Sequence, residues 1–141
     1  SISWTEESVA TLLNEVPAEK LILGVPYYTR LWMTTTDSEG NTTVDSEAVG
    51  MSLAQSTLTE NGQTATYDEA SGQNYAEWTE GDTLYQIWLE DATSMESRMQ
   101  ILTNNGLAGC ASWRVGYETS ADTSLALYHE LSTPLLAFRC P

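Results

Sequence analysis

The chain has 141 residues, of which 20 are acidic and 5 are basic, so its formal net charge is -15 at pH 7. Nucleic acids and anionic membrane surfaces are bound mainly through lysine and arginine, and the charge therefore argues against both as partners. No apolar stretch approaches the roughly 20 residues of a membrane-spanning helix. The first residues lack the basic and then apolar pattern of a signal peptide, so we expect no targeting segment in this chain.

The first segment predicts a helix followed by a buried strand. Residues 3–6, Ser-Trp-Thr-Glu, fit a capping box, and Pro17 ends the helix. The apolar residues between them recur at the spacing of one helix face: Val9, Leu12, Leu13 and Val16. Residues 21–25 form an unbroken apolar run, which is typical of a strand covered on both faces in a parallel sheet. Several aromatic and basic residues follow at the expected carboxyl end of this strand: Tyr27, Tyr28, Arg30 and Trp32.

From about residue 33 to residue 83 the composition shifts to Thr, Ser, Glu and Gly. Ser46 is a candidate cap for a helix over residues 47–61, with Gly62 just beyond its end. Three strand-like pieces follow at residues 64–68, 74–78 and 84–89, separated by turn residues. We therefore expect a small α+β insertion over residues 33–89.

The remaining chain returns to the earlier pattern. Residues 93–96 fit a second capping box, and Asn105-Gly106 ends that helix. Residues 107–113 predict a buried strand of small residues ending in Trp113, and residues 121–131 predict a last helix. Outside the insertion the order is αβαβα, which favours the α/β class with a parallel sheet.

Catalytic and metal-binding patterns are scarce. One histidine and two cysteines cannot build a zinc site of three or four such ligands, and no calcium-loop spacing is present, so we expect no metal and no cofactor. His129 is the one available base for a Ser-His-Asp triad, and its place in an amphipathic helix favours an ordinary surface role. Cys110 reads as a small buried hydrophobe, while a Cys110–Cys140 disulfide stays open for a secreted protein.

Carboxylates and aromatic rings are the residues in this sequence that could bind a ligand. Glu90 and Asp91 stand at a strand-to-helix junction, where they stabilise a helix N-terminus or face a ligand, and Glu118 follows a strand end. The aromatic set is the stronger hint, because such rings stack on sugars while Arg30 and carboxylates bind hydroxyl groups. A core role is the alternative for each ring of the set: Tyr27, Tyr28, Trp32, Trp88 and Trp113.

Two stretches of this sequence resemble glycoside hydrolase family 18. Residues 21–32 read LILGVPYYTRLW and resemble the seventh-strand segment, in which a Gly-x-Pro-aromatic-Tyr-x-Arg pattern precedes an inserted α+β domain. Residues 85–118 resemble the end of that insertion, the seventh helix and the eighth strand. The resemblance is strongest to the bacterial branch that includes spore-cortex and cell-wall lytic glycosidases.

The resemblance implies roles for particular residues. Trp113 matches the tryptophan under the reacting N-acetyl sugar, and Tyr28 and Arg30 match residues that line the groove beside it. Four others lie near such positions and align only loosely: Tyr27, Trp32, Glu90 and Glu118. In the family the sugar's own N-acetyl oxygen attacks the anomeric carbon, and one glutamic acid protonates the leaving oxygen.

The glutamic acid of the family closes an Asp-x-x-Asp-x-Asp-x-Glu signature, which this sequence lacks, and the family's Met-x-Tyr-Asp element would precede Ser1. We therefore expect the carboxyl-terminal part of a (β/α)8 barrel, with barrel segments at residues 1–32 and 90–141. A complete barrel needs roughly 250 residues. The expected partners are a polymer containing N-acetylglucosamine, and the rest of the barrel or a second copy of the chain. The resemblance implies an extracellular or cell-wall location and an isolated chain without hydrolytic activity. A non-catalytic saccharide-binding or self-assembling module is the alternative.

Overall fold

The computed structural model describes residues 1–114 and 116–118, which form three α-helices and two β-sheets. In chain order the elements are α1 (Ile2–Leu12), the 3-10 helix η1 (Ala18–Lys20), β1 (Ile22–Pro26), β2 (Tyr28–Thr36), β3 (Thr42–Gly50), α2 (Met51–Glu60), β4 (Thr66–Asp68), β5 (Gln73–Glu80), β6 (Thr83–Trp88), α3 (Ala92–Asn104) and β7 (Gly109–Trp113). A mixed α/β architecture, as expected from the sequence, is confirmed.

The smaller sheet pairs the two strands that the sequence marked as parallel. β1 and β7 run in the same direction, in a register from Ile22 opposite Gly109 to Pro26 opposite Trp113. Helices α1 and α3 cover one face of this sheet, where Leu23 and Val25 pack into a shared apolar core. The other face is open within the described part of the chain, since Ile22 is 65% exposed. The expectation of a strand covered on both faces is therefore wrong for these residues, because helices pack against one face alone.

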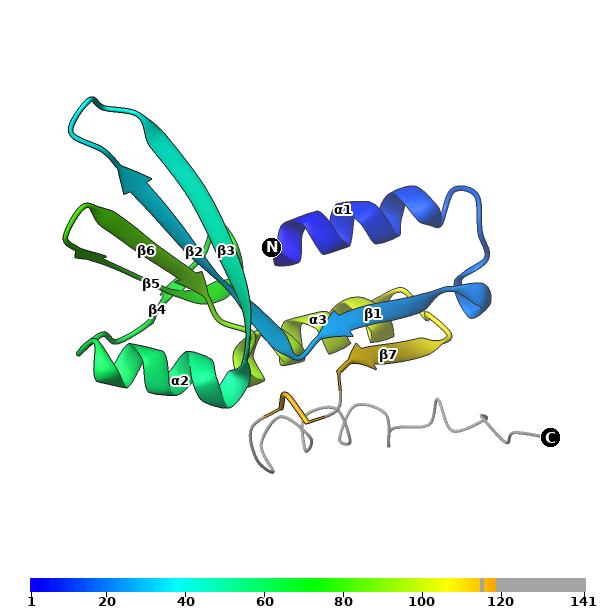
Figure 1. The fold of residues 1–141 in the computed structure, drawn as a ribbon. Helices are drawn as coiled ribbons and strands as arrows, with labels where there is room; N and C mark the ends of the chain where they lie inside the picture. Colours follow the sequence, from blue (N-terminus) through cyan, green and yellow to red (C-terminus); the bar gives the residue numbers. More distant parts are fainter. Residues whose placement is uncertain (115, 119–141) are drawn as a thin grey trace.

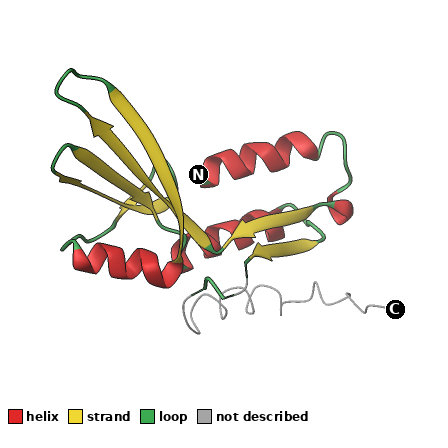
Figure 2. Cartoon of the chain, in the orientation of Figure 1, coloured by secondary structure: helices red, strands yellow, loops and turns green. Residues whose placement is uncertain are grey.

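The larger sheet has five antiparallel strands in the order β3-β2-β6-β5-β4. Helix α2 packs at its base, and the second apolar core lies between them, around Leu58, Trp78 and Ile87. The hairpin of β2 and β3 projects away from the β1–β7 pair (Figures 1 and 2). Only Tyr27 separates β1 from β2, so the chain passes from one sheet directly into the other.

The hairpin of β2 and β3 corrects the expectation for residues 33–50. Ser46 lies in β3 rather than at a helix cap, and α2 begins at Met51 after Gly50. Threonine suits a half-exposed pleated strand, and the Thr-rich stretch here forms two strands for which the sequence predicted no element before residue 47. The turn between them is closed by Asp37, whose carboxylate accepts the backbone N–H groups of Glu39 and Asn41 at 2.9 Å each. The three later strand predictions are confirmed by β4, β5 and β6.

Both predicted capping boxes are displaced by two residues. The N-terminal cap of α1 is Ser1, whose hydroxyl accepts the backbone N–H of Trp4, and α1 ends at Leu12, well before Pro17. The cap of α3 is Asp91, which exchanges side-chain and backbone hydrogen bonds with Ser94. A side chain caps a helix only from the position just outside its first turn, and both helices begin earlier than the apolar pattern indicated.

The last predicted helix, at residues 121–131, lies outside the described residues, as do His129 and Cys140. Strand β7 is present but half-exposed rather than buried, because helices cover only one of its faces. None of the described helices is long and apolar enough to cross a membrane. Within the described residues no group of three or more His, Cys, Asp or Glu side chains could hold a metal ion.

Candidate functional site

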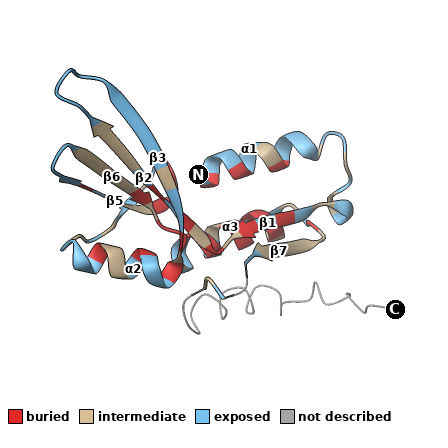
Figure 3. Ribbon diagram, in the orientation of Figure 1, coloured by how far each residue is buried: buried red, intermediate tan, exposed pale blue. Residues whose placement is uncertain are grey.

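Side chains alternate between two faces without a break from β1 into β2. From Ile22 to Trp32, odd-numbered residues are buried, and even-numbered residues are exposed or half-buried. Successive side chains of an extended chain point to opposite faces, and Tyr27 continues this pattern across the junction. Tyr28, Arg30 and Trp32 therefore share one face, while Tyr27 faces the core. Figure 3 shows buried positions in red on β1 and around its junction with β2.

A cavity of about 530 Å³ lies on that shared face. Four of the residues expected from the sequence line it: Tyr28, Arg30, Trp32 and Glu90. Its lining also includes Trp88, and two residues that sequence reasoning did not consider for a site, Asp68 and Gln73. Trp88 belongs to the aromatic set noted in the sequence, whereas Asp68 and Gln73 carry no sequence signal, because only the pairing of β4, β5 and β6 brings them here.

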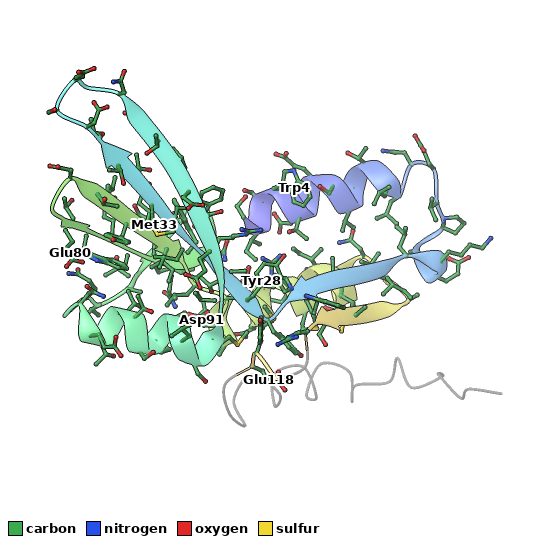
Figure 4. The ribbon with its side chains drawn as sticks, viewed as in Figure 1. Trp4, Tyr28, Met33, Glu80, Asp91 and Glu118 are labelled. Atoms are coloured by element: carbon green, nitrogen blue, oxygen red, sulfur yellow. The ribbon has the colours of Figure 1, made fainter. Side chains whose placement is uncertain are left out.

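A second hollow of about 260 Å³ adjoins the first along the β1–β7 pair. Trp113 and Ala111 line it from β7, and Pro26 and Tyr28 line both hollows. The two hollows share these two residues, and we refer to both together as the groove, which extends from Trp113 past Tyr28 to Trp32. Figure 4 shows Tyr28 at the junction of β1 and β2. The Trp113 side chain is 69% exposed, so one ring face is open to a ligand.

The groove carries one cationic and one anionic group of its own. Arg30 is exposed, and its Nη1 donates to Ser46 Oγ at 3.1 Å, which uses one of five N–H donors. The Ser71 hydroxyl and backbone N–H groups hold the pKa of the Asp68 carboxyl below its usual value. Asp68 is therefore ionised at neutral pH and accepts hydrogen bonds. Aromatic faces with such polar groups beside them suit a ligand that has both apolar patches and hydroxyl groups.

Glu90 borders the groove, but its carboxylate is already engaged. Arg98 donates to both of its oxygens, Nη2 to Oε1 at 2.5 Å and Nε to Oε2 at 3.2 Å. Ser94 Oγ and Gln73 Nε2 donate to the same carboxylate at 2.8 and 3.1 Å. Both residues of the ion pair are buried. Glu90 is therefore part of the groove wall, with both of its carboxylate oxygens bonded to protein donors.

Tyr27 and Glu118 do not line either hollow in the described part of the chain. Tyr27 packs into the core shared by α1, α3 and β1, where burial raises the pKa of its hydroxyl. The Glu118 carboxylate accepts the backbone N–H of Gly116 at 2.6 Å. The carbonyl of Tyr117 accepts the N–H of Met51 at 2.8 Å, which ties this segment to the start of α2. The peptide bond between Trp113 and Arg114 is cis.

Comparisons with known proteins agree on one family. The sequence model described as Glycosyl hydrolases family 18 matches residues 2–118. The cortical fragment-lytic enzyme of Bacillus subtilis (strain 168) is 26% identical over 105 residues, which are 74% of this chain and 24% of that protein. The chain thus spans about a quarter of the length of this curated relative.

Solved structures show the same fold. The C-terminal domain of a candidate chitinase from Desulfitobacterium hafniense DCB-2 superposes with a TM-score of 0.79 at 26% identity, covering 92% of this chain and 40% of that one. The spore cortex-lytic enzyme SleL of Bacillus megaterium QM B1551 gives a TM-score of 0.74 at 19% identity, covering 89% of this chain and 29% of that one. The second likeness is one of fold alone.

Proposed function

The chain belongs to family 18 of the glycosyl hydrolases, and from this premise we propose that it forms one wall of a groove for saccharides containing N-acetylglucosamine. The observation that carries the proposal is the groove of two hollows from Trp113 to Trp32, which is lined by Arg30 and by four aromatic residues: Tyr28, Trp32, Trp88 and Trp113. Chitin and peptidoglycan both contain the required sugar. Their pyranose rings have apolar faces for stacking and hydroxyl rims for hydrogen bonds.

The two sheets support a division of the chain into a barrel part and an insertion, and β2 crosses the proposed boundary at residue 32. Residues 1–32 and 90–141 form part of a (β/α)8 barrel, and residues 33–89 form an insertion. The parallel β1–β7 pair with helices on one face supports a barrel segment, since parallel strands are joined by helical crossovers. The five-stranded antiparallel sheet between β1 and β7 supports an insertion.

Each groove residue has a proposed role in binding. Trp113 stacks under the sugar at the reacting position, Tyr28 and Arg30 contact the neighbouring sugar, and Trp32 extends the aromatic surface. The three other candidates act on the groove from behind or beside it: Tyr27 through the core, Glu90 through its ion pair, and Glu118 through the turn at residues 116–118.

For the whole protein we propose hydrolysis of a β-1,4-linked polymer by the substrate-assisted mechanism of the family, in an extracellular or cell-wall location. The relative from Bacillus subtilis, a cortical fragment-lytic enzyme, supports a cell-wall substrate. The acid signature Asp-x-x-Asp-x-Asp-x-Glu does not occur in these 141 residues. We therefore propose that another part of the protein supplies the proton donor, and that the chain alone binds saccharide without cleaving it.

A self-assembling module is the second candidate, and the open face of the β1–β7 pair favours it. Ile22 and Trp113 are both exposed there, and β1 pairs with no described strand other than β7. Unpaired strand edges and uncovered apolar faces invite another chain. Self-assembly is compatible with saccharide binding, and light scattering over a range of concentrations tests it, because a monomer at every concentration excludes self-assembly.

The test of binding is a titration of the 141-residue chain with N-acetylglucosamine oligomers, followed by NMR chemical shifts. We expect millimolar or tighter binding, with the largest shifts at Tyr28, Arg30, Trp32 and Trp113. No release of reducing ends is expected from oligomers of chitin or from cortex fragments. Shifts confined to other surfaces, or no shifts at millimolar oligomer, would refute the binding proposal, and turnover would refute the inactivity of the chain.

A further inference from the structure

A buried ion pair lies at the groove wall, where Glu90 lines the larger hollow. Glu90 and Arg98 are 7% and 6% exposed. The guanidinium meets the carboxylate through two N–H donors, Nη2 and Nε, in the fork geometry that fixes orientation as well as distance. Such a pair constrains the position of both side chains more tightly than one hydrogen bond does.

The pair is also bonded to side chains from three separate elements. Thr5 of α1 accepts from Arg98 Nη1 at 3.1 Å, Gln73 of β5 donates to Glu90 Oε1, and Ser94 of α3 donates to Glu90 Oε2. The backbone N–H of Glu90 donates to Thr29 Oγ1 of β2 at 2.8 Å. The ion pair thus joins the two helices that cover the smaller sheet to β5 of the larger one, and the Glu90 backbone adds a bond to β2.

Stability does not explain such an arrangement well. Removing two charges from water costs several kcal/mol per ion, and apolar replacement of a buried pair is often neutral or stabilising. Each of the three neutral partners also donates to a backbone carbonyl: Gln73 to that of Leu89, Ser94 to that of Asp91, and Thr5 to that of Ser1. Loss of the pair would therefore leave both hydroxyl groups with an acceptor, and would leave one N–H of the Gln73 amide without one.

The groove is built from the same elements that the pair joins. Its 530 Å³ hollow has Ser1 and Pro26 on one side, and on the other side residues of β2, β5 and β6. Its second hollow belongs to β1 and β7, which pack on α3 through the first core. A rotation of the larger sheet relative to the helices would change the spacing between Trp113 and Arg30.

We infer that Arg98 is a positioning residue of the groove, which acts through Glu90 to hold the five-stranded sheet in one orientation against α1 and α3. Its effect on ligand affinity rests on the proposed function, whereas its effect on sheet orientation does not. Glu90 is then a support for the groove, because both of its oxygens are committed to protein donors.

The test replaces the pair and measures orientation and affinity separately. The double variant Glu90→Leu/Arg98→Met removes both charges while keeping apolar volume, Arg98→Lys keeps the charge without the fork, and Glu96→Leu on the exposed face of α3 is the matched control. Backbone N–H residual dipolar couplings of the 141-residue chain report whether one alignment tensor fits both sheets. Titration with N-acetylglucosamine oligomers reports affinity.

We expect one tensor for the wild type and the control, and separate tensors for the two sheets of the double variant, with thermal unfolding near that of the wild type. The affinity of the double variant for the oligomers should fall about tenfold, because the groups that contact the saccharide would no longer be aligned with one another. The affinity of Arg98→Lys should lie between those of the wild type and the double variant. A folded double variant with one shared tensor overturns the inference, and so does a double variant that fails to fold, because the pair would then serve stability. Absence of saccharide binding by the wild type refutes the proposed function, while the couplings still decide the role of the pair.

Discussion

The exposed ring of Trp113 provides the most direct energetic test of the groove. One face of an exposed tryptophan presents roughly 80 Å² of apolar surface, a fraction of the 150–250 Å² that an aromatic side chain buries in full. At about 25 cal/mol per Å², covering that face with a sugar is worth about 2 kcal/mol. Because every 1.4 kcal/mol is a factor of ten in affinity, Trp113→Ala should weaken binding of N-acetylglucosamine oligomers by about 30-fold.

The chain contains a matched control for this change. Trp4 is 67% exposed on α1, against 69% for Trp113, and lines neither hollow of the groove. Trp4→Ala therefore removes the same side chain from a similar surface and should leave the dissociation constant unchanged. Isothermal titration calorimetry of both variants gives the comparison. A change below threefold for Trp113→Ala, or an equal loss for Trp4→Ala, would show that stacking on this ring does not carry the affinity.

Three further predictions concern the core, the α3 cap and one carboxylate of the groove. Met99→Ala should lower the free energy of unfolding by about 2–5 kcal/mol in urea, because Met99 is fully buried between α3 and β1, whereas the exposed Gln100→Ala should change it by less than about 0.5 kcal/mol. Asp91→Ala should cost about 1 kcal/mol through loss of the α3 cap, and Asp91→Asn should restore most of it; equal thermal unfolding of both would contradict the capping role. Asp68 should titrate below its reference value of 3.8 by carboxyl NMR. Its stabilising contribution is therefore present above the unfolded-state pKa and lost as pH falls through the folded-state pKa, and a midpoint at or above the reference value would contradict its hydrogen bonding to Ser71.

The parallel strands and their neighbours could be predicted because their signals are local. The apolar run at β1 and the small-residue strand ending in Trp113 both marked strands, and Gly106, with a φ of 61°, marked the end of α3. The β2–β3 hairpin could not be found from composition, since threonine and serine are common in both loops and exposed strands. Its stability comes from pairing with β6 at the centre of the sheet, which is a contact distant in sequence.

Part of the candidate site could also be predicted, through resemblance to a family motif and not through local structural signals. Tyr28 and Arg30 were found through motif resemblance, which reports neighbours in sequence without saying which face each side chain takes. The same motif grouped Tyr27 with Tyr28, although the structure buries the first and leaves the second at the groove. Asp68 depends on the pairing of β4 with β5, and no spacing in the sequence connects it with Arg30.

The groove depends on an alternation of side-chain faces that continues along the chain from one sheet into the other. β1 belongs to a parallel pair and β2 to an antiparallel sheet, yet one residue joins them and the alternation of faces is continuous. Because the period of an extended chain is two, a single linking residue keeps Pro26 and Tyr28 on the same side, and both of them line both hollows. A linker with one residue more would turn Tyr28, Arg30 and Trp32 toward the core and leave Thr29 and Leu31 at the groove. The length of this junction is thus as much a part of the site as the aromatic side chains that it presents.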